Sequence, residues 1–293
     1  MNNETLNNFF KNRKLNYHFD DDVKYGKRQS TVNSHPNNKM KVGGLDLTSE
    51  LIKELATCLP LRINLSSHLL NIHDQLEEDI ATSCAISAAL EIRTNYINWE
   101  RYKFTKLFFG NRVSPISPSV LYIQWNANVQ SDAKEGPSIA SCLKSLESHK
   151  AVDTSKYNDN IEKINKEPDL MAFYHASKLN TIEFFKINQH EDTLKVLLSK
   201  GFPIICGIVI YPAFKDLVSY QFGLLRSPDY LKETSVGAHV IVLVGYNEDK
   251  NNFIFANSLG KRWGTDGYGV IDYTYILDNK IAGDFYTINY KGW

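Results

Sequence analysis

Hydrophobic residues recur at helical spacing over much of the first two thirds of the chain. In residues 45–60 they follow Thr48, a residue type favoured at helix N-caps, and Pro60 ends this first expected helix. A second helix is expected to begin near Thr82 and Ser83. Its first turns are hydrophobic on most sides, which indicates that it is buried. Three more segments have the pattern of amphipathic helices: residues 136–152, 168–179 and 191–201.

From residue 202 onward the pattern changes to short runs that are rich in β-branched and aromatic residues and separated by Gly, Asn and Asp. Such runs are typical of antiparallel strands joined by turns, and residues 247–252 (NEDKNN) are expected to form a hairpin loop. Helices followed by strands predict an α+β protein with two packed lobes, and clefts form readily between such lobes. The expected strands are residues 202–211, 239–247, 252–258, 268–276 and 284–290.

In the first 43 residues, the hydrophobic positions follow neither the spacing of a helix nor that of a strand. These residues are rich in Asn, Lys and Asp and poor in aliphatic residues. This composition has two interpretations: a disordered tail, or a short pro-segment or regulatory extension. The chain also begins without the apolar core and small-residue cleavage site of a secretory signal.

Composition and charge narrow the classes of partner. The chain has 293 residues, of which 43% are hydrophobic, and this is enough for a substantial core. Lys plus Arg and Asp plus Glu both number 33, so the net charge of +0 gives no electrostatic reason to expect a nucleic-acid partner. No stretch approaches the roughly 18 to 20 apolar residues of a membrane span, so we expect a soluble protein without a membrane partner.

The cysteines are widely scattered and include no C-x-x-C pair, so neither a structural zinc nor another metal is expected. Without a secretory signal, free thiols in a reducing compartment are expected. Cys142 lies within an amphipathic helix and Cys206 within an apolar strand, where a buried thiol is inert. Cys58 is likewise expected to be structural.

His239 and Asn257 lie at the edges of two apolar runs that a six-residue loop folds together. If His239 begins one strand and Asn257 ends its hairpin partner, the pair lies side by side and supplies a base and an orienting amide. Cys84 is the candidate nucleophile, because it follows Thr82 and Ser83 at the entry of the buried helix, where the helix dipole stabilises a thiolate. Alternatively, Cys84 only fills the core, and His239 and Asn257 are satisfied hydrogen-bonding residues.

Five segments resemble the papain-like cysteine proteases, in the order in which that family has them. Residues 63–91 (INLSSHLLNIHDQLEEDIATSCAISAALE) are similar to the mature N-terminus of that family, where a Gln leads to Gly-Ser-Cys at a helix start. Residues 237–271 are similar to its block of Gly-His, Asn-Ser-Trp-Gly and Trp-Gly-x-x-Gly-Tyr. The intermediate segments are similar to those of cathepsin-like proteases, especially the compact microbial and giant-virus branch: residues 117–124, 135–152 and 198–214.

This resemblance covers about residues 60–290 and implies an α+β papain-like fold, with a helical left lobe, a β-rich right lobe and the active-site cleft between them. It implies that Cys84 is the nucleophile, that His239 is the general acid and base, and that Asn257 orients the imidazole. Gln75 would donate to the oxyanion together with the backbone N–H of Cys84. The implied reaction is hydrolysis of peptide bonds in polypeptide substrates through a thioester acyl-enzyme, without a cofactor or metal.

The same resemblance divides the chain into an N-terminal extension, residues 1–58, and a protease domain, residues 59–293. By position, the extension corresponds to the pro-segment of a zymogen. It is therefore expected to lie on or near the cleft and to restrain activity. The implied location is intracellular or inside a virion.

The loop before Cys84 departs from the family pattern. Cys84 lies nine positions after Gln75, three more than in the family. The extra residues either push Gln75 away from the oxyanion or place acidic side chains near the cleft. These acidic side chains belong to Glu77, Glu78 and Asp79.

Two further departures concern the surroundings of the expected triad. Ala85 replaces the aromatic residue that usually follows the cysteine, and Leu259 replaces a Trp that shields the Asn–His hydrogen bond from water. The altered loop and Leu259 motivate an alternative, a pseudoprotease that keeps the fold as a peptide-binding module. A third hypothesis is an acyltransferase or ligase that uses the same residues.

Overall fold

The computed structural model describes residues 3–19, 40–42, 45–105, 116–130, 137–229 and 232–291. The helices are α1 (Asn3–Phe10), α2 (Ser49–Ala56), α3 (Ala81–Thr105), α4 (Val120–Gln130), α5 (Ile139–His149), α6 (Leu170–Ser177), α7 (Glu191–Ser199), α8 (Leu217–Phe222) and α9 (Tyr273–Leu277). The strands are β1 (Lys41–Val42), β2 (Leu45–Asp46), β3 (Arg62–Asn64), β4 (Ile182–Lys186), β5 (Ile204–Ile210), β6 (Leu224–Leu225), β7 (Gly237–Asn247), β8 (Asn252–Ala256), β9 (Tyr268–Asp272) and β10 (Ala282–Tyr290).

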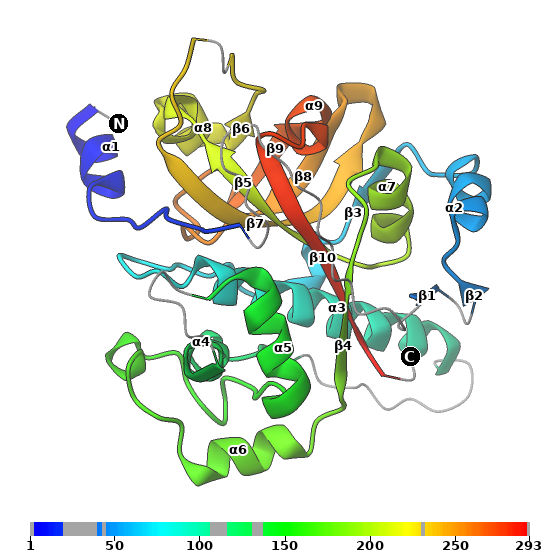
Figure 1. Cartoon of the computed structure of the whole chain (residues 1–293), viewed down its shortest axis with the longest axis vertical. Helices are drawn as coiled ribbons and strands as arrows, with labels where there is room; N and C mark the ends of the chain where they lie inside the picture. Colours follow the sequence, from blue (N-terminus) through cyan, green and yellow to red (C-terminus); the bar gives the residue numbers. More distant parts are fainter. Residues whose placement is uncertain are drawn as a thin grey trace.

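Helix α3 runs between two lobes (Figure 1). On one side of it lie α4, α5 and α6, and on the other side lies the main sheet with α7, α8 and α9. The helical lobe is held together by a set of buried residues from α3, α4, α6 and their connections, called here the left-lobe cluster. Its members are Ile80, Cys84, Val120, Leu121, Tyr122, Val152, Tyr157, Ala172 and Ala176.

The main sheet has eight strands in the order β4-β10-β5-β7-β8-β9-β6, and β3 also pairs with β7. Its pairs are antiparallel except for β6 and β9, which run parallel. Strands β7 and β8 form the expected hairpin, with Val242 opposite Ala256. The α+β fold with a helical and a β-rich lobe, expected from the sequence, is confirmed.

Helix caps explain where two of the helices begin. The Thr48 side chain accepts a hydrogen bond from the backbone N–H of Leu51 (3.2 Å), as expected for α2. The Asp159 carboxylate accepts hydrogen bonds from the N–H groups of Val120 (3.1 Å) and Leu121 (3.0 Å) at the start of α4. Sequence periodicity does not predict α4, because it is buried on most sides and has no polar face.

One expected strand is partly a helix. Residues 268–276 are predicted as one strand, but β9 ends at Asp272 and the next residues form α9. Tyr273 and Ile276 are both buried, three residues apart, and the Tyr273 ring packs against Phe253 at 4.6 Å between ring centroids. Tyr275 is buried as well, so the alternation of buried positions continues from β9 into α9 and does not mark the end of the strand in the sequence.

The N-terminal residues 3–19 are ordered, so the prediction of a disordered tail is wrong for this part. Helix α1 is followed by an extended stretch that reaches β7 of the main sheet (Figure 1). Leu6, Phe10, Leu15 and Tyr17 are buried. The rest of that expectation, residues 20–39, lies outside the described residues.

In the part of the chain that the structure describes, no helix is long and apolar enough to cross a membrane.

Candidate active site

His239 and Asn257 lie side by side, as the hairpin pattern predicts. His239 is near the start of β7 and Asn257 directly follows β8. His239 Nε2 lies 2.8 Å from Asn257 Oδ1, which also accepts a hydrogen bond from the N–H of Ser258 (2.8 Å). Because this amide oxygen only accepts, the imidazole donates through Nε2 and carries no proton on Nδ1 in its neutral form.

The surroundings keep His239 neutral. Its side chain is fully buried, with the Phe214 ring 5.7 Å away. Burial lowers the pKa of His239 to about 4; the Asn257 hydrogen bond raises it in part and the nearby Arg13 charge lowers it further. His239 Nδ1 has no hydrogen-bond partner among the described residues. This nitrogen is therefore ready to accept a proton from a suitably placed group.

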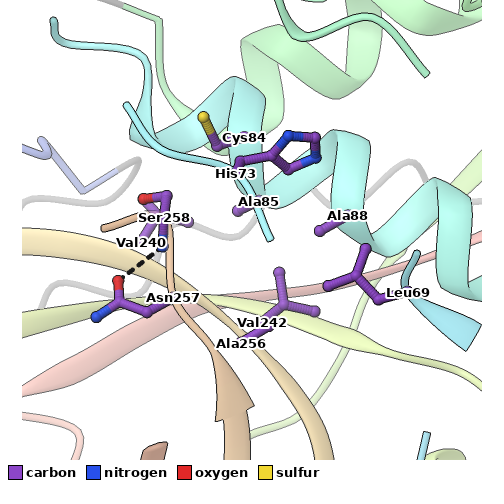
Figure 2. A pocket seen from close by; sticks show the side chains of 10 residues that line it. All are labelled: Leu69, His73, Cys84, Ala85, Ala88, Val240, Val242, Ala256, Asn257 and Ser258. Atoms are coloured by element: carbon purple, nitrogen blue, oxygen red, sulfur yellow. Dashed lines mark hydrogen bonds between the residues drawn. The ribbon is translucent and has the colours of Figure 1, made fainter. Parts of the chain in front are cut away.

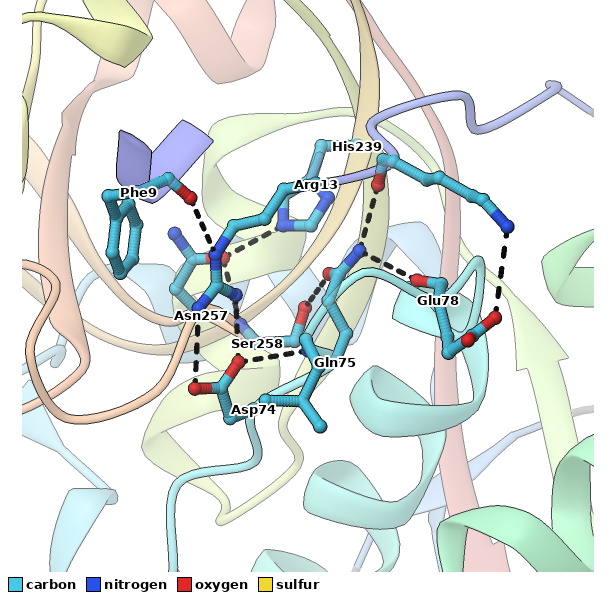
Figure 3. A network of polar contacts seen from close by, with 10 residues as sticks. Phe9, Arg13, Asp74, Gln75, Glu78, His239, Asn257 and Ser258 are labelled. Carbon is cyan, nitrogen blue, oxygen red and sulfur yellow. Dashed lines mark hydrogen bonds and ion pairs between the residues drawn. The ribbon is translucent and has the colours of Figure 1, made fainter. Parts of the chain in front are cut away.

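Gln75 is completely buried and is held in place by Ser258. The Ser258 hydroxyl donates to Gln75 Oε1 (2.7 Å), and the backbone N–H of Gln75 donates to the Ser258 carbonyl (2.9 Å). This arrangement directs the amide nitrogen Nε2 toward the N-terminal segment, where it donates to the carbonyl of Lys14 (2.8 Å) (Figure 3). Gln75 thus binds a backbone carbonyl in this structure.

Cys84 lies inside the helical lobe. It is 2% exposed and belongs to the left-lobe cluster with Ile80 and Val120. Burial raises the pKa of the Cys84 thiol well above its ordinary value, and the charges of Asp159 and Asp74 raise it further. The direction is opposite to the thiolate stabilisation expected from the sequence, because burial disfavours the charged form of the thiol.

Two further facts separate Cys84 from the expected site. Its backbone N–H donates to the carbonyl of Ile80 (2.9 Å), so it is already used and does not point to an oxyanion. Within the described residues, no hydrogen bond joins the thiol to His239 Nδ1. The structure therefore brings Gln75, His239 and Asn257 into one polar region, and Cys84 lines a small cavity next to Asn257 and Ser258 without a hydrogen bond from its thiol to His239.

A small cavity of about 10 Å³ lies between α3 and the sheet, about the space that one water molecule needs (Figure 2). The Cys84 sulfur points away from Asn257 in this view. Burial lowers the pKa of His73, whose Nε2 has no hydrogen-bond partner among the described residues. The cavity is lined by Leu69, His73, Cys84, Ala85, Ala88, Val240, Val242, Ala256, Asn257 and Ser258.

The N-terminal segment, residues 12–17, meets the loop before α3 through charged side chains. Arg13 donates to both carboxylate oxygens of Asp74 (2.7 and 3.3 Å), and the Lys14 ammonium lies 3.7 Å from Glu78 (Figure 3). The Asn12 side chain donates to Glu77 (3.0 Å). The extra loop residues thus place acidic side chains next to the segment, the second of the two expectations for this loop.

On its other side the same segment pairs with β7. The N–H of Ala238 donates to the Leu15 carbonyl (3.0 Å), and the N–H of Tyr17 donates to the Ala238 carbonyl (3.1 Å). The Tyr17 hydroxyl donates to the buried carboxylate of Asp284 (2.8 Å). Residues 12–17 thus lie between β7 and the loop before α3, in a place called here the cleft.

The Tyr17 ring lies against Gly207 of β5, where a glycine is required. A Cβ atom at Gly207 would come within 2.4 Å of Tyr17 Cε1. Sequence patterns did not identify Arg13, Tyr17 or Asp284 as site residues, because their contacts join parts of the chain far apart in sequence. The sequence holds one signal for this contact, the opposite charges of residues 12–14 (NRK) and residues 74–79 (DQLEED), which lie next to each other in the structure.

The other cysteines lie away from this site. Cys142 and Cys206 are buried as expected, and burial raises the pKa of the Cys206 thiol. Cys58 is exposed, contrary to expectation, because it directly follows the surface helix α2. All four cysteines lie within the described residues, and none of them forms a disulfide bond. Within the described ranges, no group of three or more His, Cys, Asp and Glu side chains could hold a metal ion.

Comparison with known proteins defines the class. The model of the papain family of cysteine proteases matches residues 122–284, a range that includes His239 and Asn257. An uncharacterized peptidase C1-like protein of Acanthamoeba polyphaga mimivirus is 28% identical over 198 residues, 64% of this chain and 63% of that protein. The match thus spans less than two thirds of this viral relative's length.

Two solved structures share the fold. Xylellain, a cysteine protease from Xylella fastidiosa, superposes with a TM-score of 0.70 at 21% identity, over 95% of this chain and 97% of that one. Procathepsin B of Trypanosoma congolense superposes with a TM-score of 0.56 at 14% identity, over 84% of this chain and 81% of that one. The chain therefore belongs to the papain family of cysteine proteases, a family of hydrolases.

Proposed function

We propose that the cleft of this papain-family chain binds an extended polypeptide segment, and that its own residues 12–17 are the occupant in the arrangement described here. The hydrogen bond from Gln75 Nε2 to the Lys14 carbonyl (2.8 Å) carries this proposal. The amide expected to hold a substrate carbonyl is already engaged by a carbonyl of the chain itself. A second polypeptide can enter only when the segment leaves, so the segment restrains the cleft as a zymogen's pro-segment does.

The contacts of the segment support binding of polypeptides in general together with a preference for certain side chains. Ala238 uses both of its backbone groups to pair with Leu15 and Tyr17, and such pairing along a strand does not depend on side chains. Specificity comes from two anchors. Arg13 forms a two-point ion pair with an acidic partner, and Tyr17 inserts its ring and hydroxyl into the buried region around Asp284.

A second candidate function is hydrolysis of peptide bonds by Cys84, His239 and Asn257 through a thioester. The His239–Asn257 hydrogen bond and the carbonyl contact of Gln75 favour it. It requires the Cys84 thiol to leave the left-lobe cluster and its N–H to leave the Ile80 carbonyl. The chain belongs to the papain family of cysteine proteases, which favours hydrolysis as the activity of this cleft once the segment and the Cys84 thiol have moved.

Peptide binding is tested with a chain that carries a specific cleavage site inserted between residues 19 and 40. After cutting and removal of the released fragment, a fluorescent peptide of residues 3–19 is titrated and its Kd is read from anisotropy. Replacing Arg13 by Ala in the peptide is expected to weaken binding by about 10- to 100-fold, because a charged hydrogen bond contributes roughly 1.5 to 3 kcal/mol.

Replacing Lys14 by Ala in the same peptide is the matched control. Its ion pair with Glu78 is long and both side chains are at least one third exposed, so the expected loss is less than about fivefold. Equal losses for the two variants, or no binding of the unmodified peptide, would contradict the proposed binding mode.

The same cut chain separates binding from hydrolysis. The Cys58→Ser variant, which lacks the exposed thiol, is treated with an epoxide inhibitor of the E-64 type and with a fluorogenic peptide. Binding without cleavage predicts no adduct at Cys84 and no release of fluorophore. An adduct at Cys84, together with hydrolysis that Cys84→Ala abolishes, would instead establish the second candidate function.

A further inference from the structure

We propose that η3 (Pro212–Lys215) and α8 form a second recognition site beside the cleft, which binds a short helix with two adjacent aromatic residues. This site is called here the helix-docking site, and its contact rings are Phe214 and Tyr220. In the structure, α1 of the same chain occupies it. The partner that fits it is a polypeptide in which such a helix directly precedes an extended basic stretch. The inference rests on the proposed function, because a partner can bind only when the chain's own N-terminal segment leaves.

The first observation is the packing of α1. Leu6 and Phe10 are buried, and their spacing of four residues places them on one face of the helix. Phe9 borders this face and is partly buried, whereas Asn7 and Asn8 are exposed. A helix of eight residues is too short to be stable by itself in water. Helix α1 therefore depends on its contact with the rest of the chain.

Three ring contacts join α1 to the helix-docking site. The Phe9 ring meets the Tyr220 ring edge-on, with 4.7 Å between the ring centroids. The Phe10 ring centroid lies 6.4 Å from that of Tyr220 and 6.4 Å from that of Phe214. Tyr220 and Phe214 are both buried. Because edge-on aromatic pairs add to the hydrophobic contribution of buried rings, two adjacent aromatic residues are the feature that this site selects.

The helix-docking site is fixed by contacts of its own. Asp216 caps the start of α8 through a hydrogen bond of 2.7 Å, and the Tyr220 carbonyl accepts another from the N–H of Gly264 (2.7 Å). The Phe214 ring also packs on the Trp263 ring, with 5.9 Å between centroids. None of these contacts involves α1. We therefore expect the site to keep its shape when the N-terminal segment leaves.

Arg13 fixes the position of the helix relative to the cleft. Its Nε donates to the Phe9 carbonyl (3.2 Å), and its guanidinium lies over the Phe9 ring, 4.2 Å from the centroid. The same side chain forms the ion pair with Asp74 at the cleft (Figure 3). Arg13 thus joins the end of α1 to the extended residues. A ligand that matches both sites needs its aromatic pair and its basic residue at this spacing.

Phe214 connects the helix-docking site to the candidate active site. Its ring centroid lies 6.4 Å from that of Phe10 and 5.7 Å from that of His239. The two sites are therefore continuous. A polypeptide that binds through its helix enters the cleft with the residues that follow the helix.

The test uses the full chain with Phe10→Ala and Arg13→Ala, two changes that weaken the binding of its own segment. Fluorescent peptides of residues 3–19 and of residues 11–19 are titrated against this receptor chain, and the Kd values are read from anisotropy. The shorter peptide retains the cleft contacts, and we expect it to bind at least about 30-fold more weakly. Phe10→Ala in the longer peptide is expected to weaken binding by about 30-fold, although Ala favours a helix more than Phe does.

Asn8→Ala in the longer peptide is the matched control, because Asn8 is an exposed residue of the same helix. Its Kd is expected to stay within about threefold of the unmodified peptide, since only the helix propensity changes. A double-mutant cycle then identifies the partner ring. In a receptor chain that also carries Tyr220→Ala, the loss caused by Phe9→Ala in the peptide is expected to be at least about threefold smaller.

Equal affinities of the two peptides, or equal losses from Phe10→Ala and Asn8→Ala, would overturn the inference. If Tyr220→Ala does not fold, the peptide variants still decide, because they are titrated against the receptor chain without that change. Failure of the proposed function has a different signature. In that case Arg13→Ala in the longer peptide causes no loss, whereas failure of the helix-docking site alone removes only the loss from Phe10→Ala. Absence of binding by both peptides would overturn both proposals.

Discussion

The charge of His239 is set by burial rather than by an acidic neighbour. The ring lies between the Phe214 side chain and Asn257, and Arg13 approaches it from the N-terminal segment. Burial and the Arg13 charge favour the neutral imidazole, and the hydrogen bond to Asn257 offsets them only in part. A neutral His239 whose Nδ1 has no hydrogen-bond partner among the described residues is suited to accept a proton.

This burial predicts a pH dependence of stability. The pKa of His239 is about 4 in the folded chain and 6.5 in the unfolded chain, so the unfolded state takes up the proton first as the pH falls. Stability that is fully present above pH 6.5 is lost between pH 6.5 and 4, and the loss reaches about 2 kcal/mol at pH 5 and about 3 kcal/mol at pH 4.

The measurement is urea unfolding of the wild type and of His239→Gln between pH 7 and 4. The difference between the two chains isolates His239 from His73, whose pKa is also lowered by burial. A difference that stays constant over this pH range would show that His239 is not held neutral in the folded state.

At the residue scale, the sequence could predict the His239–Asn257 contact, because a short hairpin loop fixes which residues become neighbours. The role of Gln75 as a donor to the oxyanion came from the resemblance rather than from the sequence pattern, and it stays a prediction. The location of the Cys84 thiol could not be predicted in the same way. A shift of the helix start by three residues turns a side chain by about 60° around the helix axis, and the sequence fixes helix starts only to within a few residues.

At the scale of elements, the cleft depends on the junction of the N-terminal segment with β5 and β7. Gly207 leaves the space that the Tyr17 ring fills, and Ala238 supplies the backbone groups that pair with the segment. The strands of the hairpin lie where the runs of β-branched and aromatic residues predict them. Residues 12–17 have no regular hydrophobic spacing, because some of them contact the loop before α3 and others contact the main sheet.

A double-mutant cycle tests this junction in the full chain. Gly207→Ala introduces a Cβ that would lie 2.4 Å from Tyr17 Cε1, so we expect a loss of about 1 to 3 kcal/mol in the free energy of unfolding. In a Tyr17→Ala background the same change is expected to cost at least about 1 kcal/mol less. Equal costs in both backgrounds would mean that the ring does not occupy this space in solution.

At the scale of the whole molecule, the N-terminal segment connects the two lobes. It contacts Asp74 and Gln75 in the loop before α3. It also contacts Ala238 and Asp284 in the main sheet. The resemblance to papain-like proteases predicted an extension on or near the cleft, but composition alone could not, because the segment is ordered by long-range contacts rather than by its own hydrophobicity.

The chain cut between residues 19 and 40 tests this connection. Because the cut makes the bound segment a separate molecule, the melting temperature of the cut chain is expected to rise with protein concentration, while that of the uncut chain stays constant. Added peptide of residues 3–19 should raise it further. A melting temperature that is independent of concentration in both chains would mean that the segment does not contribute to stability.

The exposure of Cys58 has a practical consequence. Of the four thiols, all of which are described, it alone reaches solvent, while the others are packed inside the two lobes. A maleimide dye therefore attaches to native protein at one site, at the end of α2, without any substitution. Air oxidation has the same preference, so preparations without a reductant accumulate covalent dimers joined at this residue.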